Sequence, residues 1–113
     1  MFSEAYRLRS EKDIQTLFAR GKGVFGVYGG LKYRPNGLPT SRCTIVVGTK
    51  VAKLAVDRNR IKRRMREVVR LLAPHIRPGY DLLFMPKNTA GTVAYPILSS
   101  SITQLIKKAS LYI

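Results

Sequence analysis

The amino-acid sequence predicts an α+β fold in which helices and a sheet form two layers. Residues 24–33 and 42–49 are rich in β-branched or aromatic residues, and 80–86 is a short apolar run, so these segments are typical of strands. Helical periodicity, by contrast, marks 57–73 and about 95–109. With a helix at the start of the chain, the predicted order is helix, two or three strands, helix, strand, helix.

The first helix is predicted over 10–21, "SEKDIQTLFARG". Ser10 can cap it, Asp13 lies three residues on as in a capping box, and Gly21 can end it. The spacing then places Ile14 and Phe18 on one face.

A turn or hairpin loop, "RPNGLPTS", is predicted between the first two strand segments, because it contains Asn-Gly and two prolines. The run "YDLLFMP" at 80–86 is expected to form a strand buried on both faces.

The second helix is expected to be capped by Asp57 and to end near Ala73, before Pro74. The last helix has apolar residues at helical spacing, with two lysines near its carboxyl end where the helix dipole favours cations. These residues are Leu98, Ile102, Leu105, Ala109, Lys107 and Lys108.

The chain has 113 residues, enough for one domain, 1–113, whose core needs no metal or disulfide. Its 21 Lys and Arg against 6 Asp and Glu give a formal charge of +15, the electrostatic signature of a nucleic-acid binder. A lipid-binding role is disfavoured because neither an amphipathic anchor nor a lipidation motif is visible. We expect a cytoplasmic protein, since the start of the chain lacks an uninterrupted apolar region and Cys43 has no partner for a disulfide.

The positive charge is densest in "DRNRIKRRMREVVR", residues 57–70, with six arginines and one lysine. At 100° per residue, one side of this helix is apolar and an adjoining side is basic. The apolar residues are Ile61, Met65, Val68, Val69 and Leu72; the polar and basic ones are Arg58, Asn59, Lys62, Arg63, Arg66 and Arg70.

A basic helix face is often only solvated, but such faces usually mix signs, and here only Asp57 and Glu67 are acidic. Arginine also suits bidentate phosphate contacts, so the pattern favours RNA or DNA. Lys50 and Lys53, just upstream, extend the positive surface.

The segment "GTKVAKLAVDRNRIKRRMRE" resembles the signature region of the protein subunit of bacterial ribonuclease P. The flanks agree, because "RLRSEKDIQTLFARG" is similar to that family's opening helix and "RPGYDLLFMPK" to its last strand. The resemblance covers nearly the whole chain in the right order. Two departures are a single lysine, Lys50, where the family often has two, and Ala52 where glycine is common.

The resemblance implies a two-layer α/β sandwich with a mixed four-stranded sheet and a left-handed βαβ crossover, similar to the second domain of ribosomal protein S5. It also implies that the basic helix contacts a catalytic RNA. That role would pass to Arg58, Asn59, Arg60, Lys62, Arg63 and Arg66, with Lys50 and Lys53 beside them.

A second surface implied by the resemblance is a cleft between the first helix and the sheet, which holds the 5′ leader of precursor tRNA. Phe18 matches one aromatic position of that cleft, and Ile14 stands at the other, leaving an apolar wall. Tyr28 and Tyr33 are candidates on the sheet; five residues apart, they would face opposite sides of a regular strand, and Tyr33 is favoured. The alternative for each of these four residues is an ordinary place in the core.

No catalytic or metal-binding motif is recognisable in the sequence: the six carboxylates form no such motif, and His75 and Cys43 are single. We therefore expect no catalytic residue and no cofactor in the protein. The resemblance implies an accessory subunit of an endonuclease, a hydrolase whose RNA cleaves the phosphodiester with Mg²⁺. Its partners would be that RNA and precursor tRNA, with no membrane and no obligate protein partner. The alternatives are a small ribosomal or general RNA-binding protein, and a self-sufficient nuclease.

Overall fold

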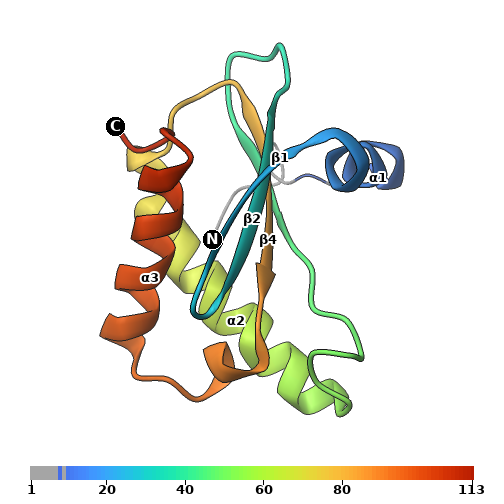
Figure 1. The fold of residues 1–113 in the computed structure, drawn as a ribbon, viewed down its shortest axis with the longest axis vertical. Helices are drawn as coiled ribbons and strands as arrows, with labels where there is room; N and C mark the ends of the chain where they lie inside the picture. The colour runs from blue at the N-terminus through green and yellow to red at the C-terminus, as the bar shows by residue number, and fades with distance from the viewer. Residues whose placement is uncertain (1–7, 9) are drawn as a thin grey trace.

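A computed structural model describes Leu8 and residues 10–113 (Figure 1). The helices are α1 (Glu11–Arg20), α2 (Ala55–Leu72) and α3 (Tyr95–Lys108), with 3-10 turns η2 (Ala73–His75) and η3 (Asn88–Gly91). The strands are β1 (Lys22–Gly26), β2 (Gly29–Pro35), β3 (Arg42–Ile45) and β4 (Tyr80–Pro86). This composition confirms the predicted α+β class.

The four strands form one mixed sheet in the order β1-β2-β4-β3. Neighbouring strands are antiparallel except β3 and β4, which are parallel and are connected through α2. Since β4 lies between β2 and β3, the loop "RPNGLPTS" joins strands that are not neighbours, and the hairpin alternative for it was wrong.

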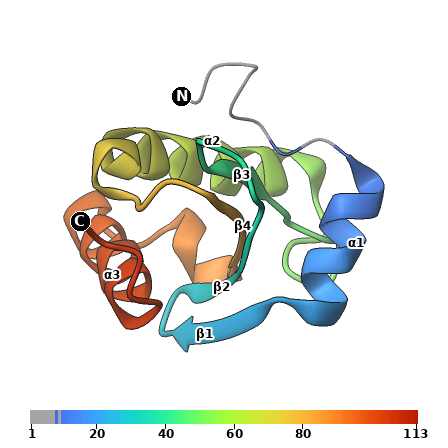
Figure 2. The same cartoon turned by 90° about the horizontal axis from the view of Figure 1, so that it is seen from above.

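The sheet separates two hydrophobic clusters. Seen from above in Figure 2, α1 and α3 lie on opposite sides of the sheet. On one face, α2 and α3 pack over Leu31, Leu82 and Phe84, all fully buried. On the other face, α1 packs through Leu17 against Leu83. Adjacent residues of β4 are thus buried on opposite faces, which confirms the prediction of a doubly covered strand.

The segment 24–33, predicted as one strand, is a hairpin instead. β1 and β2 are joined through a turn at Val27 and Tyr28, and Gly29 follows with φ +153°. A Cβ at Gly29 would lie 2.7 Å from the Met85 carbonyl oxygen, so the close approach of β4 requires glycine there. The missed turn explains why the sequence left the number of strands before α2 at two or three, where the structure has three.

The helix ends agree with the sequence in all but one case. Ser10 caps α1, its Oγ accepting a hydrogen bond from the Asp13 N–H at 3.3 Å, and Gly21 ends the helix. Asp57 is not the cap of α2: the helix begins two residues earlier, with Leu54 at the cap and no side-chain capping bond, and Asp57 lies in the first turn. A carboxylate there still interacts favourably with the helix dipole.

Candidate RNA interface

α2 is attached to the sheet by an apolar side and presents basic side chains on the other. Its buried residues are Ile61, Met65, Val68 and Val69, and they belong to the larger core cluster. Burying these four side chains fixes which arginines face outward, because the helical period leaves no other orientation.

Most residues of α2 predicted to contact RNA lie at the surface of the helix. Asn59, Arg60, Arg63 and Arg66 are exposed, and Lys62 is half-buried. None of these four basic side chains forms an ion pair with a carboxylate of the described residues. They therefore offer positive charge and hydrogen-bond donors to an outside polyanion.

Arg58 differs from its neighbours because its guanidinium is already engaged. Nη1 donates to the backbone carbonyls of Ala52 at 2.9 Å and Lys53 at 2.8 Å. Arg58 thus ties the loop before α2 to the helix and holds the exposed Lys50 and Lys53 near its N-terminus. No pattern in the sequence predicted this structural contact.

Two other arginines of α2 have hydrogen-bond partners in the same chain. Arg64 donates to the carbonyls of Ala90, at 2.7 Å, and Val93, and so attaches α2 to the segment before α3. Arg70 donates to the Glu67 carboxylate at 2.6 Å. The dense charge of residues 57–70 therefore divides between internal contacts and a free surface.

On the opposite face of the sheet, Phe18 lies at the surface of α1. Its side chain is 41% exposed, and the ammonium of Lys32 lies 5.8 Å from the ring centroid while donating to the Phe18 carbonyl at 2.5 Å. Ile14 is half-buried against the Leu17 and Leu83 cluster and contributes an apolar wall there. Lys32 was not among the predicted site residues; its alternation with the buried Leu31 is the signal that could have identified it.

Tyr33 and Tyr28 do not lie on the α1 face. Both are half-buried against the cluster formed by α2 and α3. Tyr33 is paired with Leu82, and the side chains of paired residues share a face, so the expectation that Tyr33 looks toward α1 was wrong. Tyr28 lies in the β1–β2 turn, so counting five residues along a regular strand did not apply.

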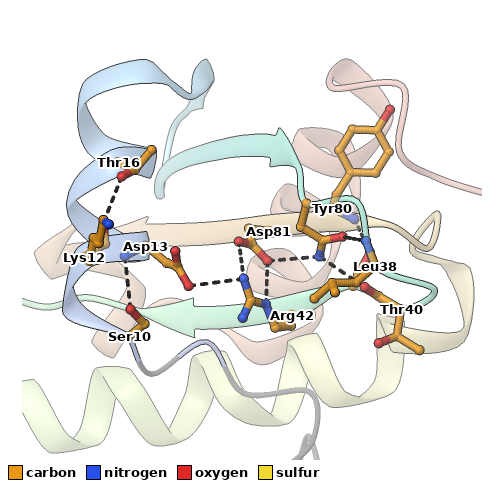
Figure 3. Close-up of polar contacts among 11 residues, drawn as sticks. Ser10, Lys12, Asp13, Thr16, Leu38, Thr40, Arg42, Tyr80 and Asp81 are labelled. Carbon is orange, nitrogen blue, oxygen red and sulfur yellow. Dashed lines mark hydrogen bonds and ion pairs between the residues drawn. The ribbon is translucent and has the colours of Figure 1, made fainter.

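Near the start of α1, a polar network joins this helix to the sheet (Figure 3). Arg42 on β3 donates to both Asp81, on β4, and Asp13, on α1, and Asn36 donates to Asp81 at 3.0 Å. The hydrogen bond to Asp81 raises the pKa of Arg42, against the opposing effect of burial. Side chains of α1 and of the strand ends line a pocket of about 220 Å³ here, which includes Arg34.

The lone cysteine and the lone histidine of the sequence both pack against other side chains of the fold. Cys43 is buried in the core, and burial raises the pKa of its thiol. His75 stacks on Tyr112 with ring centroids 5.3 Å apart. Across Leu8 and residues 10–113, no three His, Cys, Asp or Glu side chains are grouped as a metal site would require. Within the same residues, no helix is both long and apolar enough to cross a membrane.

The sequence matches the family model described as Ribonuclease P over residues 2–110. It is 36% identical to the ribonuclease P protein component of Synechococcus sp. (strain JA-2-3B'a(2-13)), covering 100% of this chain and 88% of that protein. It is 39% identical to the ribonuclease P protein component of Symbiobacterium thermophilum, covering 96% and 94%.

Solved structures agree with the sequence matches. The RNase P protein of Thermotoga maritima, in complex with 1-(4-fluorophenyl)-2-thiourea, superposes with a TM-score of 0.80 at 32% identity, covering 90% of this chain and 98% of that one. A Staphylococcus aureus RNase P protein superposes with a TM-score of 0.84 at 25% identity, covering 97% and 100%. The chain therefore belongs to the ribonuclease P protein family, whose members are accessory subunits of a ribonucleoprotein endoribonuclease acting in tRNA 5′ processing.

Proposed function

We propose that this chain, as one domain spanning 1–113, binds the RNA subunit of ribonuclease P through α2 and the 5′ leader of precursor tRNA through the α1 face of the sheet. The RNA subunit, with bound Mg²⁺, hydrolyses the phosphodiester, and the protein is not catalytic alone. The assembly works in the cytoplasm and requires no membrane and no further protein.

The observation that carries the proposal is the division of side chains on α2. Buried residues fasten one side of the helix to the sheet, while Arg60, Arg63 and Arg66 are exposed without a carboxylate partner among the described residues. Asn59, Lys62, Lys50 and Lys53 enlarge this surface, and Arg58 keeps three of its five N–H donors for RNA while its Nη1 holds the loop. A helix anchored to the sheet, with arginines exposed along one side, suits the phosphates of a folded RNA.

A leader site on the α1 face is supported by a different kind of surface. Phe18 presents an aromatic ring beside the Lys32 ammonium, and Ile14 extends the apolar wall along α1. An unpaired base can stack on such a ring while a lysine contacts the adjoining phosphate. The helices α2 and α1, which carry the two surfaces, pack on opposite faces of the sheet, so the surfaces can hold two RNAs at once.

The test is reconstitution with a bacterial ribonuclease P RNA and a precursor tRNA at low Mg²⁺, with each component also assayed alone. We expect cleavage at the mature 5′ end by the mixture only, because a subunit of charge +15 screens repulsion between the two RNAs. Cleavage by the protein alone, or an absence of stimulation, would contradict the proposal.

The leader site is tested by Phe18→Ala in the same assembly. The loss of affinity should appear only for substrates that carry a leader, while affinity for mature tRNA stays unchanged. An equal loss for both would place the effect outside leader binding.

A further inference from the structure

Phe25, on β1, is an exposed aromatic residue that the proposed leader site does not yet use. Its side chain is 62% exposed. β1 and β2 pair Phe25 with Gly30, and β2 and β4 pair Gly30 with Met85, which packs in the cluster under α1. Since paired residues share a face, the Phe25 ring lies on the α1 face of the sheet.

Two glycines allow this ring to lie flat against the strands. A Cβ at Gly30 would be 2.7 Å from Cδ1 of Phe25, and a Cβ at Gly23 would be 3.3 Å from its Cε2 and Cζ. The ring therefore occupies the space above Gly23 and Gly30 and leaves its other side open. Neither Gly23 nor Gly30 has a positive φ. The space taken by the Phe25 ring, and not an unusual backbone conformation, therefore explains why glycine stands at both positions.

Lys32 connects this ring to Phe18. Its Cγ lies 4.0 Å from the position of a Cβ at Gly23, the same position that the Phe25 ring approaches. Its ammonium reaches the Phe18 carbonyl and lies over the Phe18 ring. The surface thus runs as aromatic, cation, aromatic across α1, β2 and β1.

We propose that Phe25 is a second stacking platform for single-stranded RNA, and that Lys32 contacts the backbone phosphate between the bases on Phe18 and Phe25. The inference rests on the proposed leader site and extends it to a second nucleotide position. Aromatic rings that receive successive bases, with a cation between them, are the usual construction of a surface for unpaired RNA. The Lys32 ammonium has three donors, and one of them is used at Phe18.

The competing explanation is that Phe25 only covers glycines and stabilises the hairpin. Two variants separate the explanations: Phe25→Leu keeps an apolar cover but removes the π surface, and Phe25→Trp keeps both. Val27→Ala is the matched control, since Val27 is 71% exposed in the turn of the same hairpin. Thermal unfolding of each variant reports the structural contribution.

The experiment measures the affinity of the reconstituted ribonucleoprotein for precursor tRNAs whose leaders grow one nucleotide at a time. It also uses leaders with one abasic nucleotide placed at each position in turn. Stacking of one base predicts that Phe25→Leu weakens binding roughly five- to a hundred-fold once the leader reaches Phe25. Shorter leaders should bind as tightly as they do to the unsubstituted protein.

The abasic series identifies the base concerned. One abasic position should weaken binding to the unsubstituted protein and to the Val27→Ala and Phe25→Trp variants, yet have no further effect on Phe25→Leu. A different abasic position should behave in this way for Phe18→Ala.

The proposal is overturned if Phe25→Leu binds every leader as Val27→Ala does, or weakens all substrates equally, including mature tRNA. If Phe18→Ala binds precursor tRNAs with leaders as tightly as the unsubstituted protein does, Phe18 is not part of the leader site. Loss at Phe18 without loss at Phe25 leaves the leader site in place and removes only the second platform.

Discussion

Arg42 donates two hydrogen bonds to the Asp81 carboxylate, from Nε to Oδ1 at 2.9 Å and from Nη2 to Oδ2 at 2.7 Å (Figure 3). The two residues are paired in the parallel register of β3 and β4. The same Nη2 lies 3.4 Å from Asp13 on α1. This ion pair therefore connects two strands that are far apart in sequence to the helix that carries Phe18.

Removal of the Asp81 carboxylate should lower the free energy of unfolding. In Asp81→Ala, a partly buried guanidinium loses its main partner, for which we expect a cost of about 1–3 kcal/mol. The matched control is Glu67→Ala, which breaks an exposed pair with Arg70 and should cost below about 1 kcal/mol. Denaturant unfolding measures both; equal effects would show that the Arg42 pair is only a surface contact.

The exposed arginines of α2 should determine how RNA binding depends on salt. Replacing Arg60, Arg63 and Arg66 together with alanine removes three candidate phosphate contacts, which should flatten the slope of log affinity against log salt by about two to three. Titration of the ribonuclease P RNA at several salt concentrations measures the slope. Arg70→Ala, on the same helix but paired with Glu67, is the control, and an unchanged slope in the triple variant would remove these residues from the interface.

Replacing Arg64 should lower stability and leave RNA binding unchanged, whereas replacing Arg63 should do the reverse. Arg64→Ala deprives the carbonyls of Ala90 and Val93 of their donor, so it should lower the free energy of unfolding by about 1–3 kcal/mol. The salt slope of RNA binding should stay the same. Arg63→Ala should change the slope and leave stability within about 0.5 kcal/mol, and a reversed result would exchange the two assignments.

The buried thiol of Cys43 should make stability depend on pH in the alkaline range. Burial raises its pKa from the ordinary 9.0, so above that pH the unfolded chain releases a proton that the folded chain keeps. The folded state then binds more protons, and stability falls as the pH rises. Between pH 9 and 10 the protein should lose roughly 1 kcal/mol more than Cys43→Ala does. If the stability of the unsubstituted protein and that of Cys43→Ala fall in parallel as the pH rises, the thiol ionises equally in the folded and unfolded states.

Local signals in the sequence predicted most of the secondary structure. Ser10 and Gly21 mark the ends of α1, and the run 80–86 coincides with β4, because capping and strand burial depend on near neighbours in the chain. The β1–β2 turn was missed, since Val27 and Tyr28 are β-formers and the turn is stabilised by pairing with β4 through Gly29.

For the site, the helical period and the charge of residues 57–70 were enough to predict the exposed side of α2. They could not show that Arg58 and Arg64 are occupied, because their partners are backbone carbonyls in other segments. Tyr33 was placed on the wrong face for a similar reason: the strand pairing decides which face is which, and it joins residues distant in sequence.

The sequence by itself determined the α+β class, the basic helix and its likeness to the ribonuclease P family, because periodicity, capping and charge are local properties. Only the tertiary structure decided which cations are free and which aromatic rings share the α1 face. Side-chain contacts across the sheet depend on strand order and register, so Phe18, Lys32 and Phe25 become one surface only once β2 lies between β1 and β4.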